Sequence, residues 1–497
     1  GMEQGNDVYE NQELPIAASD VDCILLTHAH IDHSGLIPLM YVNGFRGQVY
    51  STSATAQLCE IMLRDSAHIQ MFEAEWRNRK AARSGGKLKE FVPLYDMDAA
   101  VNVCKQFVGC EYDRVYDIAE GIKIRFTDVG HLLGSASIEV WATEKTENGD
   151  VTEKIVFSGD IGNINKPIIK DPKHVRDADY VVMESTYGNR SHGGTPNYVE
   201  DLTDIFKRTF ERGGNVVIPS FAVGRTQELL YIIRKIKEDN LVGRDFDVYM
   251  DSPLAIEATN IFIKNVESCF DDEAVELVRK GINPLSFPGL KYATTGDESK
   301  QINFDPNPKV IISSSGMCEA GRIRHHLKHN LWRPECTIVF VGYQAVGTTG
   351  RIIVDGAEEI KLFGEPIQIK AEIVQLKGSS GHADKDGLLC WINAFDTKPK
   401  KVFVVHGEDS VCDEFTECLK EEYGYDAMAP YTGGSYDLIA DRVISEGVKE
   451  RKTRRTTSTQ RGKTVFDRLV AAGKRLMTVI THNEGGTNKD LAKFTDQ

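Results

Sequence analysis

Three histidines and one aspartate lie within six residues near the start of the chain, directly after the apolar residues 21–27. The cluster is His28, His30, Asp32 and His33. Imidazole nitrogens and carboxylate oxygens are common ligands of zinc and related metals. On a loop after a strand, this spacing can point ligands in two directions, so that two adjacent metals are held. A chance cluster of core histidines is the weaker alternative.

Three further candidate ligands each follow a predicted strand and stand close to a glycine. They are His131, Asp160 and His406. Ligands gathered at the carboxyl ends of strands are typical of sites in layered α/β folds. Each of these residues alone is more often an ordinary loop residue. Together with the first cluster they support one another.

Short strands and helices alternate along most of the chain, which favours an α/β or α+β fold. Strands are predicted at residues 21–27, 48–51, 122–127, 137–142, 154–158 and 180–184. Helices are predicted at residues 35–43, 54–76 and 96–107, followed by an exposed basic loop at 77–89. From Asn197 onward, regular alternation predicts parallel βαβ units, and the pattern changes again near residue 369.

Length and composition exclude several classes of protein. A chain of 497 residues exceeds a single core, and the 41% hydrophobic and 27% charged content is that of a globular protein. The net charge of −15 excludes a general basic coat for nucleic acids, so such a site would be a local patch. No apolar run is long enough to span a bilayer, and the start lacks a signal-peptide pattern. Ten scattered cysteines without a CxxC pair favour the cytoplasm.

The last part of the chain differs in charge. Residues 449–475 hold ten Lys or Arg and two Asp or Glu, which favours a disordered basic linker. Apolar residues then recur at helical spacing from Phe466 to Ile480. A helix docked on the body is the plainest interpretation. A homodimer contact and an arm that faces RNA are the alternatives.

The combined motifs resemble the metallo-β-lactamase superfamily, and within it the β-CASP nucleases. The HxHxDH motif corresponds to the first cluster, and His131 and Asp160 correspond to the next ligands of that superfamily. The β-CASP branch adds three marks, which are matched by Glu184, His382 and His406. The resemblance covers about residues 1–440. It is strongest to the endonuclease subunit of the cleavage and polyadenylation specificity factor and its prokaryotic homologues.

This resemblance implies an αββα sandwich with an inserted β-CASP α/β domain of mainly parallel sheet. Residues 1–190 and 369–445 would form the two parts of the metallo-β-lactamase domain. Residues 191–368 would be the β-CASP domain, and residues 446–497 the basic linker and C-terminal helix. The superfamily normally begins with strands and an Asp that are missing ahead of Gly5 here. We therefore expect a chain extended upstream to fold or catalyse better.

The resemblance also implies the roles of the site residues. His28, His30 and His131 would hold one Zn²⁺, Asp32, His33 and His406 a second, and Asp160 would bridge them. Mn or Fe are alternative metals. His382 would be the general acid, oriented by Glu184, with Asp32 the third residue assigned to catalysis. A His at the position of His406 goes with members that process RNA rather than DNA.

Several glycine-rich loops of the inserted block offer weaker candidates for phosphate contacts. They contain hydroxyls, arginines and backbone N–H groups near predicted helix starts. Ordinary tight turns are the alternative interpretation. The candidate residues are Ser220, Arg225, Ser315, Arg322, Gly347 and Arg351. His325, His326 and His329 share one predicted helix, where structural or RNA-contact roles are favoured over a metal site.

The sequence thus predicts a zinc-dependent ribonuclease that cuts single-stranded RNA by a two-metal mechanism. Endonuclease action is expected, with 5′-exonuclease action possible as well. A hydrolase of small esters or thioesters with the same fold is one alternative, although such substrates need no second domain. An inactive scaffold that binds RNA is the other, although every metal ligand is present.

Overall fold

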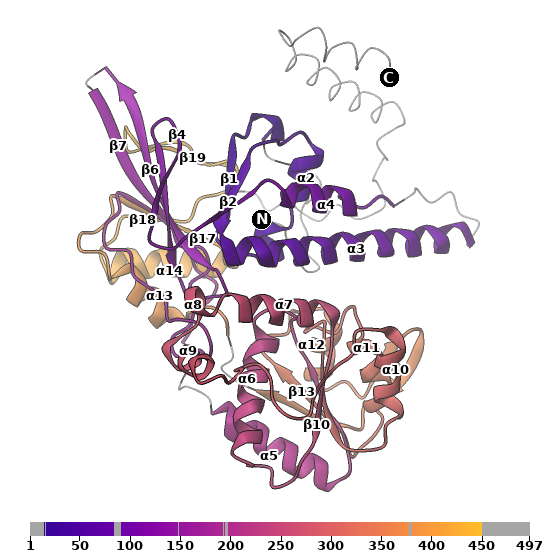
Figure 1. The fold of residues 1–497 in the computed structure, drawn as a ribbon. Coiled ribbons are helices and arrows are strands. Elements are labelled where there is room, and N and C mark those ends of the chain that lie inside the picture. The colour runs from indigo at the N-terminus through magenta and orange to yellow at the C-terminus, as the bar shows by residue number, and fades with distance from the viewer. Residues whose placement is uncertain are drawn as a thin grey trace.

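The computed structural model describes residues 14, 16–83, 91–147, 149–191, 193, 197–376 and 380–449. Figure 1 shows an upper body with the long helix α3 (Ser53–Arg83) and a lower α/β body. The predicted basic linker and C-terminal helix lie almost wholly outside the described residues. The region ahead of residue 14, to which the expectation about the first strands refers, also lies outside them.

The upper body is built on a mixed seven-stranded sheet. Its order is β18-β17-β8-β7-β6-β5-β4. The antiparallel part contains β4 (Val115–Ala119), β5 (Ile122–Asp128), β6 (Ala136–Thr146) and β7 (Gly149–Phe157). The parallel part adds β8 (Tyr180–Glu184), β17 (Lys401–Val405) and β18 (Ala427–Met428).

A second, parallel sheet of three strands packs against this one. It contains β1 (Cys23–Leu25), β2 (Gln48–Thr52) and β3 (Phe107–Cys110). Cys110, Phe126 and Ile138 are buried between the two sheets, with Leu25 and Tyr50 packed beside them. Alternate residues of such strands face the same core, which explains the alternating burial along β5.

Helices cover both outer faces of the two sheets, so the predicted αββα sandwich is confirmed. The helices on the side of the small sheet are α1 (Ile31–Ser34), α2 (Ile37–Val42), α3 and α4 (Met97–Cys104). On the other side, α13 (Lys385–Ile392) and α14 (Asp409–Glu421) bury Trp391 and Phe415 in a core shared with β7, β8 and β17.

The lower body is inserted between β8 and β17, which are neighbouring strands in register, with Glu184 opposite Val405. Its parallel sheet has the order β11-β10-β12-β9-β13-β16, which confirms the predicted parallel β-CASP-type sheet. The strands are β9 (Val216–Pro219), β10 (Asp247–Asp251), β11 (Leu290–Tyr292), β12 (Lys309–Ser313), β13 (Thr337–Val341) and β16 (Glu372–Leu376).

Helices cover both faces of the parallel sheet as well. One face carries α5 (Tyr198–Glu211), α6 (Arg225–Glu238), α7 (Pro253–Lys264), α8 (Val266–Cys269) and α9 (Asp272–Arg279). The other face carries α10 (Gly296–Phe304), α11 (Ile323–Asn330) and α12 (Thr349–Val354). Smaller elements are a 3₁₀ turn (Ala18–Asp20) and the hairpins β14 (Glu359–Leu362) with β15 (Glu365–Gln368) and β19 (Ser435–Asp437) with β20 (Arg442–Ser445).

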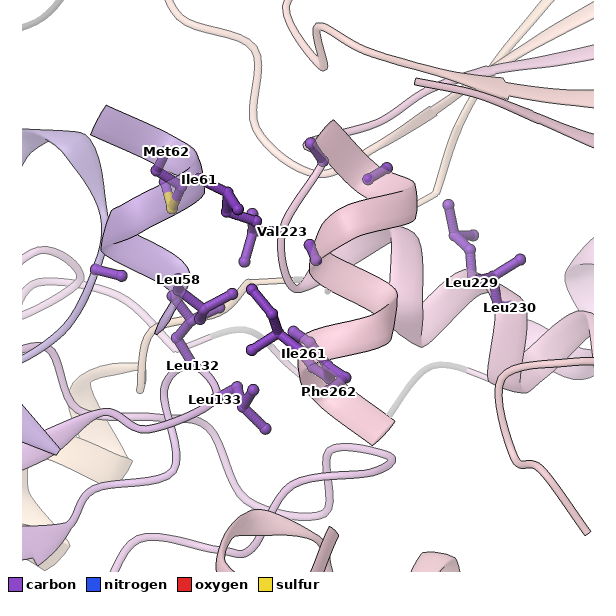
Figure 2. Packing of buried hydrophobic residues seen from close by; sticks show 14 of the residues in the cluster. Leu58, Ile61, Met62, Leu132, Leu133, Val223, Leu229, Leu230, Ile261 and Phe262 are labelled. Atoms are coloured by element: carbon purple, nitrogen blue, oxygen red, sulfur yellow. The ribbon is translucent and has the colours of Figure 1, made fainter. Parts of the chain in front are cut away.

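The two bodies share one apolar core. Figure 2 shows Ile61 of α3 beside Val223, and Leu58 beside Leu132 and Ile261 of α7. All of these side chains are buried, and Leu132 follows the candidate ligand His131 directly. Apolar packing thus fixes the inserted body against the loop that carries a candidate ligand.

Several predicted boundaries differ from the structure. The predicted helix at residues 54–76 continues to Arg83, where a basic loop was expected, because Arg77 and Arg79 pair with glutamates one turn earlier. The predicted helix at 96–107 ends at Cys104, since the following residues pair with β2 as strand β3. β16 pairs with β13 in the parallel sheet, and the domain boundary expected at residue 369 stays a prediction.

No helix in the described part of the chain is long and apolar enough to cross a membrane. The longest, α3, carries charged residues along its length.

A buried cluster of charges joins the central strands of the seven-stranded sheet. Glu139 of β6 is fully buried, and Arg125 of β5 donates two hydrogen bonds to its carboxylate, at 2.7 and 2.6 Å. Thr127 donates a third, and Lys154 of β7 lies 2.8 Å away. Burial raises the pKa of Glu139, but the bonds to Arg125 and Lys154 outweigh burial and lower it overall. The cluster therefore stabilises the sheet as long as Glu139 is ionised.

We expect Glu139→Gln to destabilise the chain by about 1–3 kcal/mol at pH 7, because it removes a buried anion that two cations bind, although Arg125 is partly exposed and Lys154 keeps Asp177 at 2.9 Å. A thermal melt followed by circular dichroism measures the loss. Because the pKa of Glu139 is lower in the folded chain, this stabilisation is complete above the ordinary pKa of 4.5 and is lost as the pH falls through the lowered value. The difference between wild type and variant should therefore shrink in acid.

The matched control is Asp117→Asn on β4. Asp117 pairs with Lys123 at 3.4 Å, and both side chains are exposed. Exposed pairs contribute roughly 0–1 kcal/mol, so this variant should melt close to wild type. Equal losses in the two variants would contradict the role given to Glu139.

Candidate metal centre

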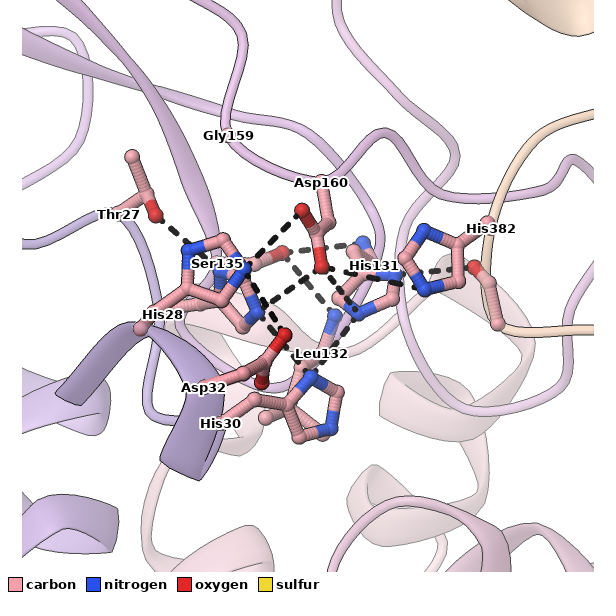
Figure 3. Close-up of polar contacts among 12 residues, drawn as sticks. Thr27, His28, His30, Asp32, His131, Leu132, Ser135, Gly159, Asp160 and His382 are labelled. Atoms are coloured by element: carbon pink, nitrogen blue, oxygen red, sulfur yellow. Dashed lines mark hydrogen bonds and ion pairs between the residues drawn. The ribbon is translucent and has the colours of Figure 1, made fainter. Parts of the chain in front are cut away.

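The candidate ligands come together at the edge where strands of the upper body end. The cluster at residues 28–33 follows β1 and continues into α1, and His131 lies in the loop between β5 and β6. Asp160 follows β7, Glu184 ends β8, and His406 follows β17. Figure 3 shows His28, His30, Asp32, His131 and His382 arranged around the carboxylate of Asp160.

Two groups of potential ligands share Asp160. In each group the ligand atoms lie within 4.8 Å of one another. The first group is His28, His30, His131 and Asp160, and the second is Asp32, His33, Asp160 and His406. The structure thus brings together all seven residues that the sequence suggested as metal ligands.

The first group is mostly buried and its nitrogens converge. Nε2 of His28 and Nε2 of His131 each lie 3.1 Å from Nδ1 of His30. The same two Nε2 atoms lie 3.3 and 3.6 Å from Oδ2 of Asp160. Three imidazoles and one carboxylate oxygen are a donor set that suits zinc.

The second group is built in the same way around the other oxygen of Asp160. Nε2 of His33 and Nε2 of His406 lie 3.3 and 3.5 Å from Oδ1 of Asp160, and 3.0 Å from each other. Oδ2 of Asp32 lies 3.5 Å from His33 and 3.4 Å from His406. This group is partly exposed, so a substrate has access to it.

Asp160 shows directly that the site suits a cation. Its Oδ1 atom is buried and accepts no hydrogen bond from the described residues. Nε2 of His33 and Nε2 of His406 lie beside this oxygen at 3.3 and 3.5 Å without a hydrogen bond to it, and a metal ion between the two groups would satisfy it. The neighbouring histidines keep the pKa of Asp160 well below its ordinary value in spite of burial.

Contacts behind the ligands orient three of the imidazoles, and one of these contacts fixes a tautomer. Nδ1 of His131 lies 3.1 Å from the carbonyl oxygen of Gly381, which can only accept, so Nδ1 carries the proton. Nε2 of His131 is then left with its lone pair facing Asp160. Thr27 lies 3.1 Å from Nδ1 of His28, and Thr186 lies 3.1 Å from Nδ1 of His406. Such partners orient metal ligands.

Burial and charge set the protonation of the site. Burial lowers the pKa of His28 and of His131, and burial together with His28 lowers the pKa of His30 to about 3. These imidazoles are neutral at pH 7, which is the form that binds metals. Burial opposes protonation of His33 as well, but Asp160 and Asp32 outweigh it and raise its pKa to about 10.

A third group lies beside the first two. His382 is near the start of α13, and its Nδ1 lies 3.1 Å from Oε2 of Glu184. Its Nε2 lies 3.9 Å from Oδ2 of Asp160. Glu184 is buried and also accepts a hydrogen bond from the backbone of Ile161 at 2.5 Å. Burial works against protonation of His382, but Glu184 outweighs it and raises the pKa of His382 to about 9.

The loop residues expected to contact phosphates engage in contacts within the lower body. Arg322 binds Asp251 at 2.7 Å, Arg225 binds Glu228 at 2.5 Å, and Arg351 binds Asp355 at 2.7 Å. Ser220 is buried, the hydroxyl of Ser315 donates to Ala320, and Gly347 has a positive φ. Their role toward a phosphate stays a prediction. His326 is buried against Asp251 at 2.6 Å, as expected for a structural histidine.

Three residues that contact the candidate ligands were not expected from the sequence to do so: Thr27, Thr186 and Lys166. Thr27 and Thr186 lie inside the quoted motifs, so their positions were visible but their contacts were not. Lys166 lies outside every motif, so the sequence did not indicate its contacts. It donates to the backbone carbonyl of His131 at 2.9 Å and lies 3.3 Å from Glu228 of α6. One ammonium thus ties a ligand loop to the inserted body.

Two family models match the chain. Residues 226–353 match the Beta-Casp domain, and residues 366–430 match the Zn-dependent metallo-hydrolase RNA specificity domain. Ribonuclease TTHA0252 of Thermus thermophilus is 33% identical over 410 residues, which cover 82% of this chain and 86% of that protein.

Two further relatives are similar in identity but differ in length. The transcription termination factor FttA of Methanosarcina mazei is 32% identical over 86% of this chain and 66% of its own length. The RNase J-like protein of Methanocaldococcus jannaschii is 31% identical over 78% of this chain and 82% of its own. The matched region therefore covers slightly less than two thirds of that FttA protein. It covers more than four fifths of Ribonuclease TTHA0252 and of the RNase J-like protein.

We expect His131→Ala to purify with at least one metal ion fewer per chain than wild type, because it removes a ligand of the buried group. Metal analysis of the purified protein measures this loss. His68→Ala is the matched control, since His68 is exposed on α3 outside the site.

Metal-dependent stability gives a second readout. Chelator-treated wild type should gain thermal stability when Zn²⁺ is added, and Asp160→Asn should gain much less. A full complement of metal in His131→Ala, or an unchanged response in Asp160→Asn, would contradict the ligand assignment.

Proposed function

The chain belongs to the β-CASP family of ribonucleases with the metallo-β-lactamase fold, and from that premise we propose that it cuts single-stranded RNA internally with two zinc ions. Hydrolysis of RNA follows from the family. The number of metals, the internal cut and the roles of single residues are what we add here.

The proposed ligand sets follow the geometry of the cluster. His28, His30 and His131 would hold one metal, Asp32, His33 and His406 the other, and Asp160 both. Two bound zinc ions lower the pKa of water and neutralise charge on the phosphate under attack. The buried histidines are neutral and preset for this role, so little reorganisation precedes metal binding.

The contact between His382 and Glu184 is the observation that carries the proposed mechanism. Glu184 binds Nδ1 of His382 at 3.1 Å and keeps that ring protonated, while Nε2 faces the shared carboxylate of Asp160. A proton held at Nε2 can be donated to the 3′-oxygen that leaves when the phosphodiester bond breaks. Glu184 would orient the acid and stabilise its charge. Asp32, which is partly exposed, would hold a metal together with His33 and His406.

The inserted body supports a polymeric substrate. It packs against the loop of His131 through Leu132 and Val223, and its strand β16 leads toward His382. A small ester or thioester would not need this second body beside the metals. A scaffold without activity would not need two complete sets of ligands. Ribonuclease action is therefore favoured over both alternatives.

We expect the metal-loaded chain to cleave a circular single-stranded RNA, which has no ends and so reports endonuclease action alone. His382→Ala should lower kcat by roughly 10²- to 10⁴-fold while the metal content stays unchanged, because only the acid is removed. Product sizes on a denaturing gel and metal analysis of the same samples measure both.

Substrate controls separate the alternatives. A 5′-phosphorylated linear RNA of the same sequence tests for additional 5′-exonuclease action, and a thioester and nitrocefin test for small-substrate hydrolysis. Loaded metals with no cleavage of RNA would refute the proposal. Full activity of His382→Ala on the circle would refute the role of the acid.

A further inference from the structure

Two aromatic side chains follow neighbouring strands of the parallel sheet and stand partly in solvent. Phe221 lies two residues after β9, and Tyr343 lies two residues after β13. β9 and β13 pair directly and in parallel. The exposed fractions are 46% for Phe221 and 50% for Tyr343. Both residues therefore lie at the carboxyl edge of the sheet, which is where open α/β sheets bind ligands.

One glycine contacts the ring of Phe221 and is linked through Gln344 to the backbone of Tyr343. A Cβ atom at Gly316 would lie 3.0 Å from Cδ2 of Phe221, so this ring packs directly on the backbone of the loop after β12. The carbonyl of Gly316 also accepts a hydrogen bond from Nε2 of the buried Gln344, at 3.1 Å. The same Nε2 donates to the carbonyl of Tyr343 at 3.2 Å. The loops of Phe221 and Tyr343 are thus tied to a common point.

This edge of the sheet lies close to the metal centre. Val223, two residues after Phe221, belongs to the core that contains Leu132, the neighbour of His131 (Figure 2). β16 pairs with β13 and ends at Leu376, six residues before His382. Six residues span at most about 20 Å. A single strand of a few nucleotides that starts at the metals could therefore reach this edge of the sheet.

We propose that Phe221 and Tyr343 form a stacking site for bases of the single-stranded RNA, a few nucleotides from the bond that is cut. This inference rests on the proposed function. Stacking suits an enzyme that reads no fixed sequence, since every base has a π-face. The polar edge of the Tyr343 ring remains available for a hydrogen bond to a base or a ribose. A ring that already packs on a backbone loses little freedom when a base stacks on it.

The first test is the steady-state kinetics of RNA cleavage. Phe221→Ala and Tyr343→Ala should each raise KM about 5- to 100-fold and leave kcat within about threefold, because stacking contributes to binding rather than to chemistry. Phe221→Tyr and Tyr343→Phe keep a ring and should restore KM. Phe304→Ala is the matched control, since Phe304 is 72% exposed at the end of α10, away from this edge. Its KM should equal that of wild type.

The second test pairs ring and base. An abasic nucleotide is moved along the RNA one position at a time. At the position that stacks on a ring, loss of the base should weaken binding to wild type but not to the matching Ala variant. Equilibrium binding of the same RNA to His382→Ala chains, with and without the ring substitutions, gives a readout that does not depend on cleavage.

The outcomes separate this inference from the proposed function. Cleavage by wild type with unchanged KM and binding in both Ala variants would overturn the stacking site and leave the ribonuclease intact. That result would fit a surface for a protein partner instead. Tight binding without cleavage, weakened by the Ala variants, would overturn the ribonuclease and support the stacking site. Neither cleavage nor binding of RNA would overturn both.

Discussion

The buried carboxylate of Asp160 is the interaction on which the site depends. Each of its oxygens faces a different set of imidazoles, and Oδ1 has no hydrogen-bond donor among the described residues. A charge in that position is stable only when cations surround it. The loops at the ends of β1, β5, β7 and β17 must therefore meet at one point. The two-sheet sandwich supplies the rigid frame that lets them do so.

The inserted body is coupled to this frame in two ways. Apolar side chains from both bodies fill one core next to His131, as Figure 2 shows for Leu132 and Val223. Lys166 adds a polar link, because it binds the carbonyl of His131 and the carboxylate of Glu228 together. Burial lowers the pKa of Lys166 in spite of Glu228. A shift of the inserted body would therefore move the loop that carries His131.

Much of the site could be predicted because its signals are local. His131, Asp160 and His406 each follow an apolar strand, so the place of every candidate ligand in the fold could be read from its neighbours. The parallel sheet could be predicted from regular alternation. Contacts between distant segments could not. β3 became visible only through its pairing with β2, and nothing near Arg322 in sequence indicates that Asp251 would bind it.

The neighbouring positions of β8 and β17 have a consequence for how this architecture can diversify. The chain leaves the metal frame at Glu184, the end of β8, and returns to it with His382 and α13 before it enters β17 at Lys401, beside β8. An insertion between two strands that pair in one sheet can leave the pairing of those strands intact. The inserted body can therefore lengthen, shrink or change its surface while the metal frame keeps its geometry. Such changes are tolerated only away from the shared core and the Lys166 link, because those contacts reach the loop of His131.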